Sequence, residues 1–211
     1  MLIHPWDAAT REEWAAVLAA HDFGQLVTAG HVDGFPVVVP THFHFDGDHT
    51  VLLHLARPNP VWRALAADPR VVLAVAADWA YVEAAWNADG DPSTGVPTSY
   101  YTAVHLLGTA EVVDDPEEKA AILRTQLAHH EPGSGRVPPS VRVESDRRQL
   151  PGIRGVRITV EAVRAKEKYG GNRTADHRRA IAHRLAERSR PGDVAAREQL
   201  LRRLDADDRP E

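Results

Sequence analysis

Three short segments of the chain carry polar, aromatic and imidazole side chains next to apolar stretches. The first runs from His54 to Trp62 and reads His-Leu-Ala-Arg-Pro-Asn-Pro-Val-Trp. The second spans residues 96–105 and reads Val-Pro-Thr-Ser-Tyr-Tyr-Thr-Ala-Val-His. The third spans residues 166–172 and reads Lys-Glu-Lys-Tyr-Gly-Gly-Asn. Rigid strands that end in such side chains are a common way to present a ligand site, so the segments indicate a bound cofactor or substrate.

The first segment has the chemistry of an anion-binding site. Asn59 is a good N-cap residue, and Pro60 suits the first position of a helix. The start of such a helix offers free backbone N–H groups and the positive end of the helix dipole. Arg57 stands beside it, and its guanidinium can pair with a phosphate or a carboxylate.

Two histidines are candidate ligands for a metal. His54 lies in the apolar stretch 51–56, three residues before Arg57, and His105 lies in another apolar stretch after the two tyrosines. A single histidine on a strand is usually a hydrogen-bonded structural residue, and this interpretation stays open for both. The chain has no cysteine, which excludes thiolate ligands, iron–sulfur clusters and disulfides.

A histidine-rich stretch, His42-Phe-His44-Phe-Asp46-Gly-Asp48-His49, is similar to the zinc motif of metallo-β-lactamase-fold hydrolases. The spacing differs by one residue, and Asp46-Gly47 is a strong hairpin signal. The turn would carry His49 onto the returning strand. We therefore favour a half-exposed sheet face with alternating His and Phe.

In the third segment Lys166 and Lys168 are two residues apart, so a strand places them on one face. Gly170 and Gly171 permit a close backbone approach, although a plain hairpin turn would explain them equally well.

The rest of the chain predicts many short strands and a few helices. Thr10 to Glu13 form a capping box, Asp115 and Pro116 open a second helix, and residues 174–188 form a third. This pattern favours an α+β, mainly antiparallel β protein that closes into a barrel with peripheral helices. We expect one domain over residues 1–190, followed by a charged, helical and solvated C-terminal tail over 191–211. Strands are expected at 25–29, 36–45, 50–56, 71–76, 79–84, 100–113 and 153–165.

The composition narrows the class of protein. With 211 residues and 43% hydrophobic residues the chain can bury a sizeable core. Its net charge of −5 makes nucleic-acid binding an unfavoured interpretation. We see no secretion signal and no apolar run of membrane-spanning length, so we expect a cytoplasmic protein that does not enter a membrane.

The three segments together resemble the PaiB-type FMN-binding split-barrel family. That family carries His-x-Ala-Arg-x-Asn-Pro-x-Trp, Val-Pro-Thr-Trp-Asn-Tyr-x-x-Val-His and Gly-Lys-x-Lys-x-Ser-Gln-Asn in this order, and the resemblance extends over about residues 1 to 186. It implies a six-stranded split β-barrel that forms a homodimer and holds a planar cofactor. Its members are labelled FMN-binding proteins or negative transcriptional regulators.

The chain departs from the family pattern near the expected cofactor. Ser99-Tyr100 replaces Trp-Asn, and Gly170-Gly171 replaces Ser-Gln. Loss of polar side chains would remove flavin contacts and widen the pocket, which suits heme. In this respect the chain resembles the branch of heme-dependent piperazate synthases, which convert N5-hydroxy-L-ornithine into a cyclic hydrazine. FMN binding in a PaiB-like oxidoreductase or regulator is the alternative.

This resemblance implies roles for particular residues. The cofactor would be heme b, with His54 or His105 as the iron ligand, and an amino acid would be the substrate. Tyr100, Tyr101, Lys166 and Lys168 are the candidates for substrate binding and proton transfer. The other expected cofactor contacts are Arg57, Asn59, Trp62, Thr98, Gly171 and Asn172.

Overall fold

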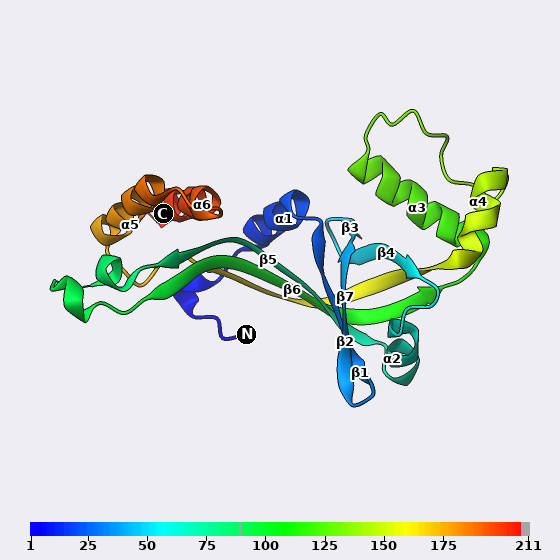
Figure 1. Cartoon of the computed structure of the whole chain (residues 1–211), viewed down its shortest axis with the longest axis horizontal. Coiled ribbons are helices and arrows are strands. Elements are labelled where there is room, and N and C mark those ends of the chain that lie inside the picture. Colours follow the sequence, from blue (N-terminus) through cyan, green and yellow to red (C-terminus); the bar gives the residue numbers. More distant parts are fainter. Residues whose placement is uncertain (89, 208–211) are drawn as a thin grey trace. The chain divides into compact units, whose positions relative to one another are not determined.

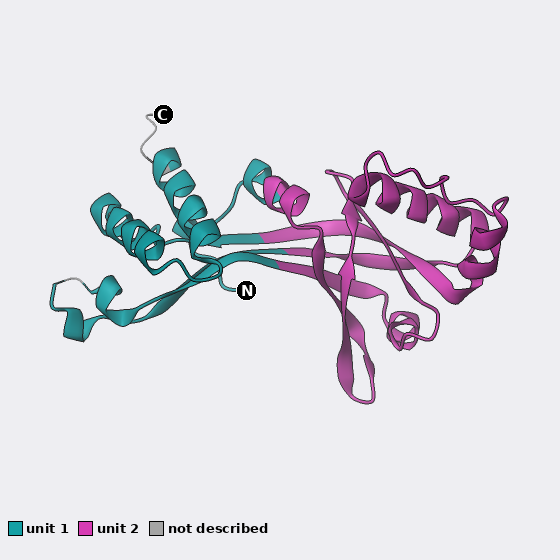
Figure 2. Cartoon of the chain, turned by 45° about the horizontal axis from the view of Figure 1, so that its top comes forward, with its two compact units in different colours: residues 1–14, 76–104, 165–211 teal, residues 15–75, 105–164 magenta. Residues whose placement is uncertain are grey.

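The computed structural model describes residues 1–88 and 90–207 of the chain. The chain divides into two compact units, which Figure 2 shows in different colours. Strands β5, β6 and β7 each contribute residues to both units. Unit 1 consists of residues 1–14, 76–104 and 165–211, and unit 2 consists of residues 15–75 and 105–164.

Figure 1 labels the helices and strands along the chain. The helices are α1 (Arg11–Ala20), α2 (Val61–Ala67), α3 (Pro116–His130), α4 (Glu144–Gln149), α5 (Ala175–Arg188) and α6 (Asp193–Asp207). The strands are β1 (Phe23–Val32), β2 (Phe35–His42), β3 (His44–Phe45), β4 (Thr50–Ala56), β5 (Arg70–Val82), β6 (Thr98–Val113) and β7 (Ile153–Lys168). None of the described helices has both the length and the apolar character that a membrane span needs.

The strands form one sheet in the order β2-β1-β5-β6-β7-β4-β3. The pairs β1–β2, β1–β5, β3–β4 and β4–β7 are antiparallel. The prediction of a mainly antiparallel β fold with peripheral helices is therefore confirmed, with seven strands in place of six. In β4 the apolar residues Val51, Leu53 and Leu55 are buried on one side, so His54 points to the other.

Local sequence signals set several element ends. Thr10 and Glu13 exchange backbone-to-side-chain hydrogen bonds of 2.8 and 3.3 Å, which confirms the capping box of α1. Asp115 Oδ1 accepts the N–H groups of Glu117 and Glu118 at the start of α3. At the start of α5, Thr174 Oγ1 accepts the N–H of His177 at 3.3 Å.

The region of residues 71–84 differs from the expectation of two strands, because it forms the single strand β5. Asp78 interrupts its regular geometry, because its φ of 51° lies in the left-handed region. Two contacts within unit 1 hold this conformation. Tyr169 Oη donates to the carbonyl oxygen of Asp78 at 2.8 Å, and Gln199 Nε2 donates to its carboxylate at 2.9 Å.

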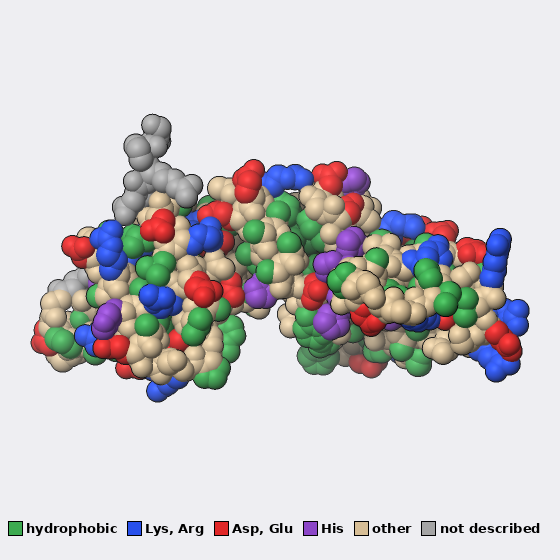
Figure 3. Space-filling view, turned by 90° about the horizontal axis from the view of Figure 1, so that it is seen from above, with side chains coloured by type: hydrophobic (Ala, Val, Ile, Leu, Met, Phe, Trp, Pro, Cys, Tyr) green, Lys and Arg blue, Asp and Glu red, His purple; other side chains and the backbone are tan. Residues whose placement is uncertain are grey.

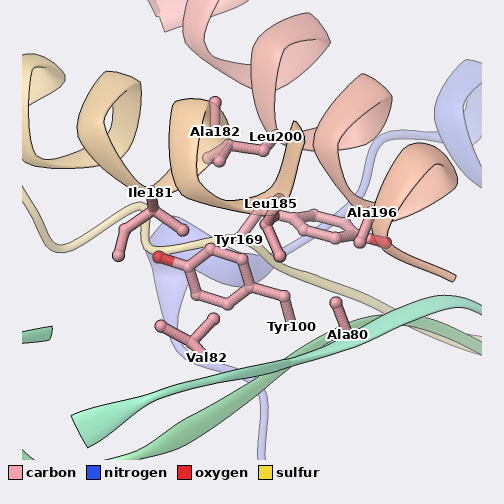
Figure 4. Packing of buried hydrophobic residues seen from close by; sticks show 9 residues of the cluster. All are labelled: Ala80, Val82, Tyr100, Tyr169, Ile181, Ala182, Leu185, Ala196 and Leu200. Carbon is pink, nitrogen blue, oxygen red and sulfur yellow. The ribbon is translucent and has the colours of Figure 1, made fainter. Parts of the chain in front are cut away.

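Unit 1 is built around a buried cluster that includes α6. Figure 4 shows the rings of Tyr100 and Tyr169 between the strand that carries Ala80 and Val82 and the overlying helices. The two rings meet edge to face at 5.8 Å. On the helix side, the cluster contains Ile181, Ala182, Leu185, Ala196 and Leu200. The expectation of a solvated tail is wrong for this face of α6, because residues four apart form a buried stripe.

A buried carboxylate joins β7 to α6. Glu167 is 1% exposed, and its Oε2 accepts a short hydrogen bond from Arg202 and lies 3.5 Å from Nη1 of Arg203. Both arginines also pair with Glu13, at 3.0 and 3.2 Å. Burial raises the pKa of Glu167, while the two guanidinium groups oppose that rise.

We expect Leu200→Ala to lower the free energy of unfolding by about 2–5 kcal/mol, because it would leave a cavity in the cluster of unit 1. Val194 lies on the same helix and is 61% exposed, so Val194→Ala is the matched control and should change stability by less than about 0.5 kcal/mol. Urea unfolding of both variants measures the difference. Equal stabilities would mean that α6 does not pack as described.

Candidate functional site

A cavity of about 370 Å³ lies within unit 1. It is lined mainly by polar side chains from the start of the chain, the start of β6 and the end of β7. Several residues that the sequence analysis predicted to act at one site line this cavity together. They are Thr98, Tyr100, Lys166, Lys168 and Asn172.

The two lysines of β7 both line this cavity, as their spacing predicts. Lys166 Nζ donates to the carbonyl oxygen of Leu2 at 2.9 Å and lies 3.4 Å from the carboxylate of Asp7. Lys168 Nζ donates to Thr98 Oγ1 at 2.7 Å. Burial lowers the pKa of Lys168, and the positive charge of Lys166 lowers it further. Lys168 is therefore the better candidate for a group that exchanges a proton.

Tyr100 brings an unused hydroxyl group to the cavity. Its side chain is 2% exposed, and among the described residues its Oη has no hydrogen-bond partner. Burial raises the pKa of Tyr100 to about 12, so the phenol stays protonated at neutral pH. A ligand with an acceptor atom would satisfy this hydroxyl. Tyr101, the other predicted tyrosine, has both lysine Nζ atoms 5.9 Å from its ring centroid.

The two glycines after β7 allow close approach of other groups of unit 1 and not of a cofactor. A Cβ at Gly170 would lie 2.4 Å from Tyr100 Oη, and a Cβ at Gly171 would lie 2.4 Å from the carbonyl oxygen of Trp6. The missing side chains make room for two groups of the same unit. The interpretation that they widen the pocket for a larger cofactor is wrong.

The start of the chain is the part of this cavity that sequence reasoning missed. Leu2, His4, Trp6 and Asp7 all line it. His4 stacks on Trp6 at 4.7 Å with an interplanar angle of 8°, and Asp7 is 3% exposed. The pairing of Ala8 with Lys166 holds this segment in place, and no short-range pattern connects residues so far apart in sequence.

A second cavity, of about 630 Å³, lies within unit 2 and is lined by His54 together with His42, Gln126 and His130. Residues 131–150 contain α4 and contribute Arg136, Pro139 and Gln149 to the same cavity.

The hydrogen bond between His54 and Gln126 fixes the chemistry of the imidazole. His54 Nδ1 lies 2.7 Å from Gln126 Oε1, and Gln126 Nε2 lies 3.5 Å from the carbonyl oxygen of His42. An amide oxygen only accepts, so Nδ1 carries the proton and donates. Nε2 of the neutral ring then keeps a free lone pair, which can bind a metal or accept a proton.

The other candidate ligand, His105, is half-buried on β6 and lines neither of these two cavities. Burial lowers the pKa of its imidazole, with nearby Arg164 adding to the effect. The lowered pKa favours the neutral imidazole at pH 7, but among the described residues no side chain orients His105 as Gln126 orients His54.

The expected anion-binding site at α2 is largely occupied by internal contacts. Asn59 Oδ1 accepts the N–H of Val61 at 2.9 Å, but the helix begins at Val61 with Pro60 as its N-cap, so the prediction of Asn59 as N-cap and Pro60 as first residue is wrong by one position. Arg57 donates to the carbonyl oxygen of Pro151 at 2.6 Å and forms a two-point ion pair with Asp114. This pairing holds the pKa of the Asp114 carboxyl below its usual range. The indole of Trp62 is buried and donates to the carbonyl oxygen of Ala56 at 3.1 Å.

The predicted site residues thus form two groups, each within one unit. Unit 1 holds Thr98, Tyr100, Tyr101, Lys166, Lys168, Gly171 and Asn172, and unit 2 holds His54, Arg57, Asn59, Trp62 and His105.

We expect Gly170→Ala to destabilise unit 1 by more than the strain of a positive φ alone, because the new methyl group would collide with Tyr100 Oη. Gly34→Ala is the control, since Gly34 has a similar φ of 84° with no atom within 4 Å. Adding Tyr100→Phe should recover part of the loss caused by Gly170→Ala. Thermal unfolding of these three variants and of Tyr100→Phe alone tests this, and the absence of any recovery would contradict the contact.

We also expect stability to fall as the pH rises from 10 to 12. An unfolded chain ionises Tyr100 near pH 10, whereas burial keeps the folded phenol neutral up to about pH 12. A raised pKa stabilises the fold below the unfolded value and loses that contribution above it, here about 2–3 kcal/mol. Tyr100→Phe should therefore flatten the fall, while Tyr81→Phe, at a half-exposed position, should not. Urea unfolding at several pH values measures both slopes.

Comparisons with known proteins agree with this architecture. The family described as "Putative FMN-binding domain" matches residues 1–162. The protease synthase and sporulation protein PAI 2 of Bacillus subtilis is 27% identical over 177 residues, which cover 81% of this chain and 82% of that protein.

Among solved structures, the FAD and heme binding protein from Mycobacterium smegmatis is similar with a TM-score of 0.61, at 21% identity, over 82% of this chain and 78% of that one. The flavocytochrome Anf3 from Azotobacter vinelandii gives a TM-score of 0.57, at 21% identity, over 79% and 75%. These likenesses confirm the predicted split-barrel fold. The family is shown by the match over residues 1–162: the chain belongs to the FMN-binding domain family.

Proposed function

We propose that the chain is a heme-dependent enzyme that converts N5-hydroxy-L-ornithine into piperazic acid by intramolecular dehydration. The observation that carries the proposal is the imidazole of His54, which Gln126 orients on a cavity of about 630 Å³. The substrate rests on the resemblance of the three segments to the piperazate synthase branch.

The residues of the larger cavity fit heme. Its volume lies within the range of cofactor and ligand sites. A histidine that binds a metal commonly donates its other N–H to an oriented acceptor, as His54 does to Gln126. Two similar structures support the proposal, since one is an FAD and heme binding protein and the other is a flavocytochrome. Bound heme would supply a Lewis-acidic iron with one open position.

The reaction itself needs proton transfers that residues of the smaller cavity can perform. The N–N bond forms as the N–O bond breaks, one water leaves, and no external reductant is consumed. The α-amine must lose protons to become a nucleophile, and Lys168 with its lowered pKa is the proposed base. Tyr100 is the proposed donor to the leaving oxygen, because its hydroxyl is protonated and unpartnered. Lys166 and Asn172 would hold the carboxylate of the substrate. A homodimer is also part of the proposal.

FMN binding in an oxidoreductase or a regulator is the second candidate. The description of the family favours it. Against it stands the chemistry of the phosphate site, because Arg57 is already paired with Asp114 and bonded to Pro151. A phosphate would have to displace a carboxylate that makes two hydrogen bonds.

Absorption spectra of the purified protein separate the two cofactors. We expect a Soret band from wild-type protein, its loss or displacement in His54→Ala, and a nearly unchanged band in His105→Ala. Gln126→Ala should weaken heme retention about 10–100-fold, because the imidazole loses its orienting partner. A flavin spectrum from wild-type protein would overturn the heme proposal, and an unchanged band in His54→Ala would overturn the ligand.

The substrate is tested separately by incubation with N5-hydroxy-L-ornithine and mass detection of a dehydrated cyclic product. We expect Tyr100→Phe and Lys168→Met to keep the Soret band and to lower the rate by about 100-fold or more. Heme without product would contradict the substrate and leave the cofactor proposal standing. Sedimentation at micromolar concentration checks the homodimer.

A further inference from the structure

Unit 2 gathers one carboxylate and four imidazoles in a small region at the edge of the larger cavity. Histidine side chains, coloured purple, cluster on the face that Figure 3 shows. The residues are Asp22, just before β1, His42 at the end of β2, His44 in β3, and His129 and His130 at the end of α3. We refer to them as the Asp22 cluster.

The nitrogen atoms of the cluster converge on the carboxylate of Asp22. His129 Nε2 and His130 Nδ1 each lie 3.1 Å from Asp22 Oδ2, and His42 Nδ1 lies 3.6 Å from Oδ1. One ligand atom from each of Asp22, His42 and His130 can be chosen so that all lie within 4.8 Å of one another. In a tetrahedral zinc site the ligand atoms are about 3.4 Å apart, so small side-chain rotations would close this set on one ion.

Two imidazole nitrogens of the cluster lack partners. His44 Nδ1 and His130 Nε2 are buried, and neither has a hydrogen bond among the described residues. The ring centroid of His130 lies 5.1 Å from that of His42 and 4.8 Å from that of His129. Imidazolium groups so close together repel one another, and neutral rings leave polar nitrogens unsatisfied. A bound cation would take up lone pairs of neutral rings in the ligand set, so these rings need not be protonated beside one another.

We propose that Asp22, His42 and His130, with His129 at their side, bind one divalent transition-metal ion of the zinc class. Imidazole nitrogen combined with a single carboxylate is a donor set typical of zinc. Asp22 supplies the single carboxylate of the set. The side chains of His42, Asp22 and His130 are 62, 34 and 24% exposed, which leaves the ion a way in.

The ion would join three elements of unit 2, namely the segment before β1, the end of β2 and the end of α3. His42 and His130 also line the larger cavity, so the ion would fix one part of its wall. Asp22 does not line that cavity, which makes it the residue to change without disturbing a bound cofactor. His49, which the zinc-like sequence pattern included, pairs only with its neighbour Asp48 at 2.8 Å and stands outside the cluster.

The test uses full-length protein, freed of metal with a chelator and titrated with Zn²⁺ in a calorimeter. We expect one ion per chain with micromolar or tighter affinity. Asp22→Asn, His42→Ala and His130→Ala should each weaken binding at least tenfold. His49→Ala is the matched control, since it removes an exposed histidine from another Asp–His pair and should leave the affinity unchanged. Circular dichroism verifies that each variant is folded.

Titration with Co²⁺ gives a second readout, because nitrogen and oxygen ligands around the ion should produce visible absorption in wild-type protein that is lost in Asp22→Asn. Equal zinc affinity in wild type, Asp22→Asn and His130→Ala would overturn the proposal. A loss of zinc affinity in His49→Ala would overturn it as well. The Soret band of Asp22→Asn should equal that of wild type. A failure of the zinc proposal can therefore be distinguished from a failure of the heme proposal.

Discussion

The buried carboxylate of Glu167 is the constraint on which the smaller cavity depends. Adjacent residues of a strand point to opposite sides, so fixing Glu167 against Arg202 and Arg203 directs Lys166 and Lys168 to the other side, where the cavity lies. An unpaired carboxylate at this depth would be very costly, which forces α6 to supply its cations. The last helix of the chain is thereby required for the position of two lysines on a strand far from it in sequence.

What the sequence made predictable was mostly local. The capping box at Thr10, the N-cap at Asp115 and the alternation in β4 depend on neighbours within a few residues, and the structure has them as expected. The contribution of Leu2 to Asp7 to the cavity could not be predicted, since it results from a pairing of Ala8 with Lys166 that leaves no periodic trace. The continuity of β5 through Asp78 was missed for the same reason, because its support comes from Tyr169 and Gln199.

For the candidate sites, the sequence indicated which residues make special contacts better than it indicated what those residues contact. Gly170 and Gly171 were rightly singled out as positions of close approach, but the approaching groups are Tyr100 and Trp6 and not a cofactor. Arg57 has the position of an anion-binding residue, yet Asp114 takes its guanidinium. The histidines of the Asp22 cluster come from stretches about 90 residues apart, so only the fold could bring them together.

The hydrogen bond between His54 and Gln126 has one more consequence. The oxygen and the nitrogen of an amide occupy nearly equivalent positions, so a half-turn of the Gln126 amide would present its NH₂ group to Nδ1 of the imidazole. Nδ1 would then have to accept, and the proton would move to Nε2. The ring would become a hydrogen-bond donor toward the cavity and would lose its lone pair there. The carbonyl oxygen of His42, which faces the amide nitrogen, therefore acts as a selector of the tautomer.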